Sequence, residues 1–217
     1  MTEPLPPVFN RKNPLLASIC SKKLLTEGCE TKRTWHLEID LLGSGLSFTP
    51  GDSLALLPQN DPALANELIE TLGFSGDETV INPTKEEITL SKALIENYVI
   101  TTPDKKLLRS IAEKAENAEL SSLLDREKKK DLANHLWGRD IIDVLKENPE
   151  AKFEASEFVG LLKKLNVRLY SIASSLSYHP DRVDLTVAIV EYESHGRKRQ
   201  GVCSSWISER ATEDSKI

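Results

Sequence analysis

The chain has 217 residues, 39% of them hydrophobic and 29% charged, a balance typical of a soluble globular protein with one large or two small domains. Its formal net charge of -6 argues against nucleic acid as a partner, and no apolar stretch approaches the roughly 20 residues needed to cross a bilayer. Three cysteines without a CxxC pair and four scattered histidines predict neither a disulfide framework nor a metal site. The first residues lack the layout of a signal peptide, so we expect a cytoplasmic protein without a membrane partner.

The N-terminal quarter has a β-type pattern. Residues 1–13 are rich in proline and are predicted to form an arm or linker. Apolar residues at alternate positions of 35–41 predict a strand with one buried face, and the run at 15–25 suits another strand. The Pro50-Gly51 turn then leads into a third strand at 53–57. Three antiparallel strands in so short a stretch favour a barrel or sandwich.

The apolar period changes near residue 59. Asp61 is a suitable N-cap, Pro62 suits the first helical position, and Gly73 suits the helix end. Apolar stripes predict that most of the chain is helical as far as residue 165. The further helices are expected at 90–98, 105–118, 141–146 and 155–165. A helical segment at 59–165 is therefore expected to interrupt the β pattern.

The β pattern returns after this segment. Strands are predicted at 167–174 and 183–192, with a turn at 195–197 closing a hairpin. A short helix is expected to follow Gly201 and to run to about residue 210.

The first of these returning strands carries the polar groups of most chemical interest. Successive side chains of a strand point to opposite faces, so Arg168 and Tyr170 share one face and Ser171 lies on the other. A guanidinium can pair with phosphate, and a Gly-x-x-Ser turn that opens a helix, as at 201–204, presents backbone N–H groups to an anion. The ring of Tyr170 could stack on a heteroaromatic group. Groups that bind phosphate beside a ring that stacks suggest a dinucleotide as the ligand. On spacing alone, a surface Arg–Tyr pair and ordinary helix capping are the simpler interpretation.

Three motifs in order resemble the FAD signature of ferredoxin-NADP reductase-like enzymes: Arg-x-Tyr-Ser at 168–171, the strand residues 186–188, and Gly-x-x-Ser at 201–204. With Pro50-Gly51-Asp52, the run at 59–62 and the helical segment, the sequence is similar to diflavin reductases, above all those of NADPH-sulfite reductase flavoprotein type. The resemblance implies a mainly β plus α fold: an antiparallel FAD-binding barrel of the six-stranded type, whose last strand is expected to be missing. The barrel would comprise 14–58 and 166–217, with 59–165 as an inserted all-helical connecting domain.

The resemblance also implies roles for individual residues. Ser171 would be the catalytic residue, since its hydroxyl would hydrogen-bond near the flavin N5 that accepts hydride. Arg168 would pair with the pyrophosphate, Tyr170 would stack on the isoalloxazine, and Tyr192 would lie near the adenine or ribose. The implied cofactor-binding residues are Arg168, Leu169, Tyr170, Ser171, Thr186, Val187, Ala188, Tyr192, Gly201, Val202, Cys203, Ser204 and Thr101.

In this family NADPH reduces FAD, FAD passes electrons to FMN, and FMN reduces a metalloprotein. The resemblance therefore implies the FAD-binding module of an NADPH-dependent oxidoreductase. Its partners would be an FMN-binding, flavodoxin-like domain or protein and an acceptor such as a sulfite reductase hemoprotein. No FMN domain is recognisable before Pro14 and no nucleotide-binding βαβ domain after Ile217, so we expect a fragment or a truncated relative in which NADPH and FMN act only through other domains. The alternative is a non-catalytic module that uses this surface for protein docking.

Packing roles are expected for several further residues. Cys203 is interpreted as a small packing residue within its turn rather than as a redox thiol. Trp35, Trp137 and Trp206 are expected to pack in the interior, with contact to the cofactor as the alternative for Trp206.

Overall fold

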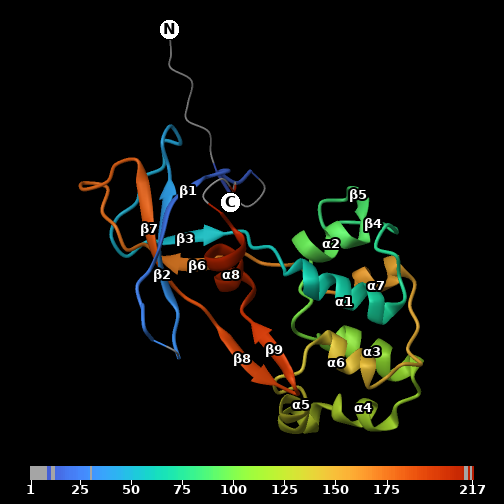
Figure 1. Ribbon diagram of the computed structural model, residues 1–217. Helices are drawn as coiled ribbons and strands as arrows, with labels where there is room; N and C mark the ends of the chain where they lie inside the picture. The colour runs from blue at the N-terminus through green and yellow to red at the C-terminus, as the bar shows by residue number, and fades with distance from the viewer. Residues whose placement is uncertain (1–8, 11–12, 30, 213–214, 216) are drawn as a thin grey trace. The chain divides into compact units, whose positions relative to one another are not determined.

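A computed structural model describes residues 9–10, 13–29, 31–212, 215 and 217. Most of the expected N-terminal arm, 1–8 and 11–12, therefore lies outside the described residues. The chain divides into two compact units (Figure 1). The β unit comprises Met1–Pro58, Asn166–Glu191 and Gln200–Ile217, and the helical unit comprises Gln59–Leu165 and Tyr192–Arg199. The segment Tyr192–Arg199 was expected to belong to the barrel with the rest of 166–217, whereas the structure groups it with the helices.

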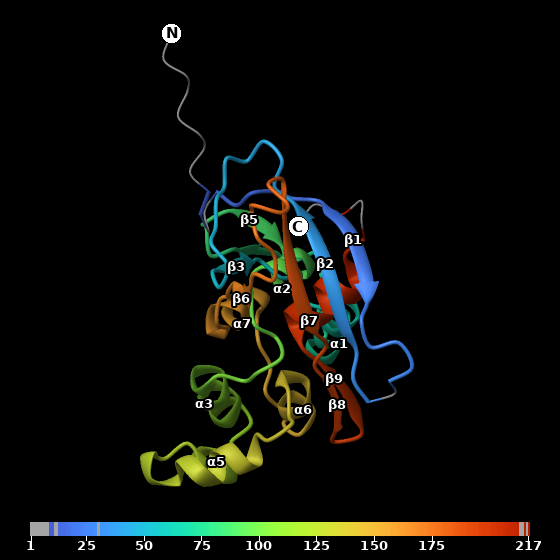
Figure 2. The same ribbon diagram turned by 90° about the vertical axis from the view of Figure 1, so that its left-hand side faces the viewer.

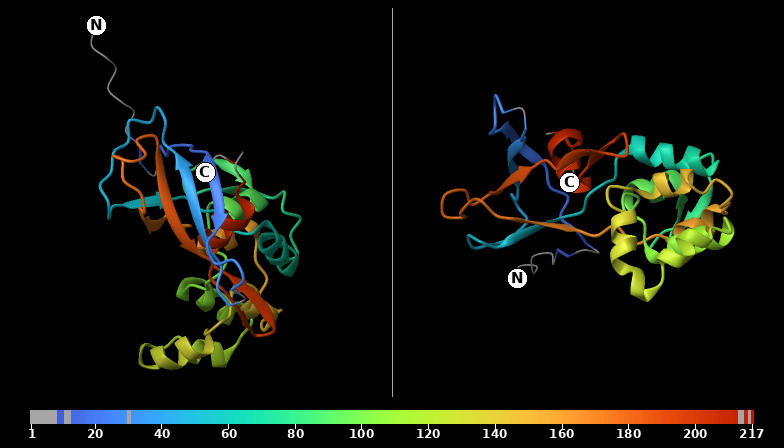
Figure 3. Two further views of the ribbon diagram at one scale, coloured as in Figure 1. Left: turned by 60° about the vertical axis from the view of Figure 1, so that its left-hand side comes forward. Right: turned by 90° about the horizontal axis from the view of Figure 1, so that it is seen from below.

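The β unit contains two antiparallel sheets. One has the strand order β1-β2-β7, formed by β1 (Ile19–Leu24), β2 (Thr34–Asp40) and β7 (Arg182–Ala188), which lie side by side in Figures 2 and 3. The other pairs β3 (Ser53–Leu56) with β6 (Arg168–Ser171). The third N-terminal strand thus pairs with a strand more than a hundred residues later. No closed barrel is formed by the described strands, and the fold class is mixed α and β with antiparallel sheets.

The alternating pattern of β2 produces the buried face that the sequence predicts. Leu37 and Ile39 are at most 1% exposed and pair across the sheet with Leu185 and Val183 of β7, which are fully buried. Trp206 is 7% exposed and belongs to the same core, so its predicted packing role is confirmed.

The predicted strand at 183–192 is wrong at its C-terminal end. β7 ends at Ala188, and a separate hairpin follows from β8 (Glu191–Ser194) and β9 (Arg197–Gln200). After the Ile189 N–H has donated to the Arg33 carbonyl at 2.9 Å, the chain enters the hairpin, where the Gly201 N–H donates to the Val190 carbonyl at 2.8 Å. The predicted helix after Gly201 is confirmed as α8 (Val202–Ser205), which continues into the π-helical turn η2 (Trp206–Arg210).

The helical unit begins with α1 (Pro62–Leu72), whose ends follow the predicted signals. The Asp61 side chain accepts a hydrogen bond from the Ala63 N–H at 2.9 Å, and Gly73 adopts the left-handed conformation with φ of 76°. The other predicted helices are present as α2 (Leu90–Glu96), α3 (Lys105–Lys114), α6 (Ile141–Lys146) and α7 (Ala155–Leu161). The short strands β4 (Thr79–Ile81) and β5 (Glu87–Thr89) were not predicted. Helical structure was expected for most of 59–165, but three elements within it were not delimited: α4 (Ala118–Leu123), η1 (Arg126–Lys128) and α5 (Lys129–His135).

A separate hydrophobic core supports the helices. Its members with no exposed surface include Leu68, Leu94, Leu107, Ile111 and Phe158. Trp137 is not among them. Its side chain is 82% exposed, which overturns the predicted packing role. Trp137 follows the end of α5 and is held through its backbone: its N–H donates to the Asn134 carbonyl at 3.2 Å, and its carbonyl contacts the His195 ring. Within the described residues, no helix is long and apolar enough to cross a bilayer.

Candidate functional site

Strand β6 is held along its length by distant segments. It pairs with β3 in a register that sets Tyr170 opposite Leu54 and Arg168 opposite Leu56. Beyond its end, the Ile172 N–H donates to the Asp52 carbonyl at 2.8 Å, and Ile172 forms a bridge with Leu185 of β7. The sequence signal for this support is the Pro-Gly turn, which delivers Asp52 to the start of β3.

The polar residues of β6 differ in exposure. Arg168 and Ser171 are exposed and Leu169 is 66% exposed, whereas Tyr170 is partly buried against the core of the β unit. The Tyr170 hydroxyl hydrogen-bonds the Cys203 thiol, and the charge of Arg168 acts on both groups. The first and third sequence motifs, separated by some thirty residues, are therefore brought together.

The turn that opens α8 is compact. The Ser204 hydroxyl donates to the Gly201 carbonyl and accepts from the Val190 N–H, each at 3.3 Å. A Cβ atom on Gly201 would lie 2.6 Å from the Ser204 oxygen and 3.0 Å from the Val190 Cβ. Glycine is thus required by close approach rather than by φ, which is -69°. Val190 was missed by the sequence analysis, because its role is a backbone contact that no residue type signals.

The middle motif lies on β7. Val187 is fully buried, while Thr186 and Ala188 are exposed on the opposite face. β7 is the outer strand of its three-stranded sheet as described, and beyond the bridge at Leu185 its outer edge has no partner strand in that sheet. The backbone N–H and C=O groups of 186–188 that point away from β2 are therefore on an edge that can pair with a ligand.

Thr101 and Tyr192 belong to the helical unit, not to this grouping. Thr101 lies in a partly exposed bend, and Tyr192 is 54% exposed on β8. Among the described residues, no group of three His, Cys, Asp or Glu side chains could hold a metal ion.

Burial controls the ionisation of the two groups at the centre of the site. It raises the pKa of Cys203 to about 11, although the hydrogen bond from Tyr170 and the charge of Arg168 act in the opposite direction. It also raises the pKa of the Tyr170 hydroxyl, and the Cys203 sulfur adds to that shift. Both groups are therefore protonated at neutral pH, and Cys203 is a buried packing residue, 3% exposed.

Cys203 is expected to resist alkylation in the folded chain. Its raised pKa leaves about a hundredfold less thiolate at pH 8 than an ordinary cysteine, and burial blocks access. Cys29 is the matched control, because it is exposed and a hydrogen bond with Thr31 lowers its pKa. Iodoacetamide labelling read by peptide mass spectrometry should modify Cys29 first, and modification of Cys203 at the same rate would contradict the described burial.

The raised pKa of Cys203 also predicts a loss of stability at high pH. A thiol whose pKa is raised in the folded state contributes fully to stability only below its ordinary pKa, so the free energy of unfolding should fall as pH rises from about 9 towards 11.

The chain belongs to the family described as FAD binding domain, which it matches over residues 7–206. It is 40% identical over 203 residues, 93% of its length, to the sulfite reductase [NADPH] flavoprotein alpha-component of Bacillus subtilis (strain 168). It is 38% identical over 210 residues to the protein of that name from Aliivibrio fischeri (strain ATCC 700601 / ES114), and 36% over 209 residues to that of Vibrio parahaemolyticus serotype O3:K6 (strain RIMD 2210633); each match covers 96% of this chain. The chain spans about a third of the length of these relatives, 34%, 34% and 33%.

The residues present fit FAD, the cofactor of this family. The donor set suits a pyrophosphate, because the exposed Arg168 guanidinium and the first N–H groups of α8 both favour anions. The close approach at Gly201 keeps side-chain bulk away from the turn, which is the condition for backbone N–H groups to meet a phosphate. The partly buried Tyr170 ring offers an aromatic surface beside both.

Proposed function

We propose that this chain is the FAD-binding module of an NADPH-dependent diflavin oxidoreductase of sulfite reductase flavoprotein type. The observation that carries the proposal is that Tyr170 of β6 hydrogen-bonds Cys203 in the turn that opens α8, with the charge of Arg168 acting on both groups. Family membership and the names of the relatives support the same function. In this proposal the β unit provides the FAD-binding barrel, the helical segment 59–165 is the connecting domain, and the protein acts in the cytoplasm.

Bound FAD supplies the redox chemistry, and the chain supplies binding and orientation. Arg168 and the N–H groups of 202–204 bind the pyrophosphate, Tyr170 stacks on the isoalloxazine, and 186–188 contact the flavin through the edge of β7. The exposed Ser171 hydroxyl donates a hydrogen bond near the flavin N5. Tyr192, near the adenine or ribose, and Thr101 are the remaining proposed cofactor contacts.

Electrons are proposed to pass from NADPH through FAD towards FMN and a metalloprotein acceptor. The relatives' printed name supports NADPH as the donor and sulfite reduction as the process served. A flavodoxin-like FMN domain or protein and a sulfite reductase hemoprotein are the proposed partners.

Titration of the chain, freed of bound flavin, with FAD tests the proposal. We expect one FAD per chain, retained on gel filtration, with the visible absorption of a bound flavin. A chain that stays colourless at saturating FAD would contradict the assignment and would favour the alternative, a docking module with a vestigial flavin site.

A further inference from the structure

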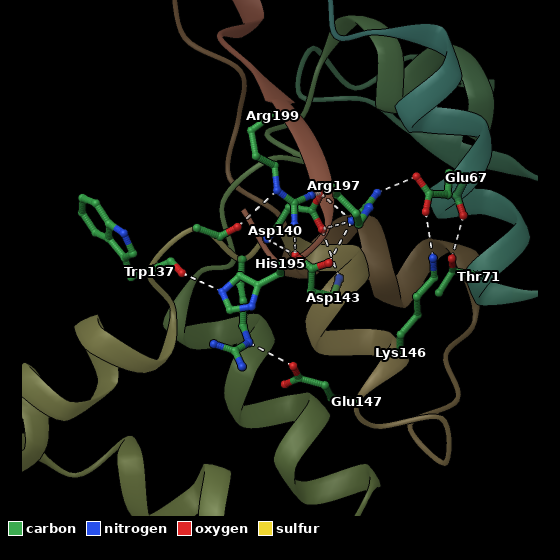
Figure 4. Close-up of polar contacts among 12 residues, drawn as sticks. Glu67, Thr71, Trp137, Asp140, Asp143, Lys146, Glu147, His195, Arg197 and Arg199 are labelled. Carbon is green, nitrogen blue, oxygen red and sulfur yellow. Dashed lines mark hydrogen bonds and ion pairs between the residues drawn. The ribbon is translucent and has the colours of Figure 1, made fainter. Parts of the chain in front are cut away.

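The helical unit contains a buried cluster of opposite charges that connects hairpin β8–β9 to helix α6 (Figure 4). Asp140 is the N-cap of α6 and forms a capping box with Asp143, so two carboxylates lie side by side at the helix start. Arg197 donates from Nη1 to both Asp140 oxygens at 2.9 and 3.0 Å and to Asp143 at 3.0 Å. Arg199 donates to Asp140 at 2.5 Å and also to Asp143.

The cluster is electrically balanced. Arg197 also pairs with Glu67 of α1, which in turn pairs with Lys146 at 2.8 Å, giving three positive and three negative side chains when Asp140, Asp143 and Arg199 are included. Asp140 is 4% and Arg199 8% exposed. Pairs this buried persist only when each charge is matched and hydrogen-bonded, so the cluster specifies one position of the hairpin on α6.

Two backbone contacts reinforce the cluster. The Gly138 carbonyl accepts from Arg199 Nε at 3.2 Å, and the Trp137 carbonyl contacts the His195 ring at 3.0 Å. A Cβ on Gly138 would lie 1.9 Å from the Ser194 oxygen, so the turn before α6 fits closely against the end of β8.

The hairpin depends on this anchor, because it has little apolar surface of its own. Its strands have four residues each, and its one large apolar side chain, Tyr192, is 54% exposed. No hairpin residue belongs to the hydrophobic core of the helical unit as described. A two-stranded hairpin is at best marginally stable alone, so contacts such as those of the ion cluster are needed to order it.

We propose that Arg197 and Arg199 are positioning residues for FAD: by fixing the hairpin on Asp140 and Asp143, they hold Tyr192 in place for the adenylate half of the cofactor. This inference rests on the proposed function, which assigns Tyr192 to the adenine or ribose end.

Comparing FAD with FMN tests this inference, because FMN has the same ring but lacks the adenylate half. Dissociation constants for both would be measured by flavin fluorescence for the wild-type chain, Arg197→Met, Arg197→Lys and Lys163→Met. Lys163 is the matched control, a cation in the same unit paired with Asp104 at 2.8 Å through a side chain that is 69% exposed. Hydrogen exchange at 192–199 would be followed in parallel.

Arg197→Met should weaken FAD binding by about tenfold and FMN binding by less than about twofold, because lost preorganisation affects only contacts from the hairpin. Arg197→Lys should give an intermediate loss, since it keeps the charge but not the forked geometry. The hairpin amides should exchange faster in Arg197→Met and not in the control. If Arg197→Met does not fold, the dissociation constants of Arg197→Lys for FAD and FMN test the inference.

An unchanged ratio of the two constants in both Arg197 variants would overturn the inference, because general destabilisation affects both flavins equally. That result would leave the proposed function intact. A wild-type chain that binds FAD no better than FMN would instead overturn the proposed function, and with it the assignment of Tyr192.

Discussion

Replacing Arg199 with methionine is expected to lower the free energy of unfolding of the helical unit by about 3–5 kcal/mol. The substitution removes one guanidinium and leaves Asp140, only 4% exposed, without its hydrogen bond of 2.5 Å. Asp140 keeps its hydrogen bonds from Arg197, so the loss follows mainly from two poorly exposed carboxylates, Asp140 and Asp143, that each lose one guanidinium partner. Urea denaturation followed by far-UV circular dichroism would measure it.

Lys163→Met is again the control, because its ion pair with Asp104 is exposed on the lysine side and such pairs contribute at most about 1 kcal/mol. Equal losses in the two variants would show that the cluster is no more than a surface network.

The same cluster predicts sensitivity to acid. Burial acts to raise the pKa of Asp143, but the hydrogen bonds from Asp140 and Arg197 and the charge of Arg199 outweigh it, so the pKa is lowered. A carboxyl group whose pKa is lowered in the folded state stabilises the fold fully at pH values above its ordinary pKa. It loses that contribution as pH falls through the lowered pKa. Burial raises the pKa of Asp140 instead, so this carboxyl takes up its proton before Asp143 does. The stability difference between wild type and Arg199→Met should therefore begin to narrow above the ordinary aspartate pKa of about 4 and narrow further below it.

Replacing Arg168 with alanine is expected to weaken FAD binding by roughly 10- to 150-fold. A hydrogen bond to a charged group contributes about 1.5–3 kcal/mol, and Arg168 is assigned to the pyrophosphate. Riboflavin has no phosphate, so its affinity should change by less than about twofold. Isothermal titration with both ligands would measure the difference.

Arg182→Ala is the matched control, since it also removes an arginine from a strand of the β unit, where it pairs with Glu38. If FAD affinity falls equally in the two variants, Arg168 acts only through overall charge and the phosphate contact is wrong.

Much of the local structure could be predicted because it depends on neighbouring residues. The capping of α1 by Asp61 and its end at Gly73 follow from side-chain and backbone preferences within one turn. The buried face of β2 follows from alternation alone. The strands β4 and β5 were missed because three residues are too few to display a period.

The remaining features depend on contacts between distant residues. The contact of Tyr170 with Cys203 spans some thirty positions, and that of Arg197 with Asp140 spans 57. No sequence period predicts either one. Trp137 was assigned to a core because of its residue type, whereas its position after α5 places the ring in solvent. The motifs thus identified the type of cofactor, and the folded chain was needed to show which residues lie together.

The most direct test of the central claim, that FAD binds where β6 meets the turn at Gly201, is a titration of Tyr170→Ala with FAD. Loss of the stacking surface should weaken binding by roughly 5- to 150-fold, by analogy with about 1–3 kcal/mol for a base stacked on an aromatic side chain. Tyr178→Ala should bind as the wild type does, because Tyr178 is 81% exposed in the loop before β7. Equal FAD affinity in all three proteins would contradict the account.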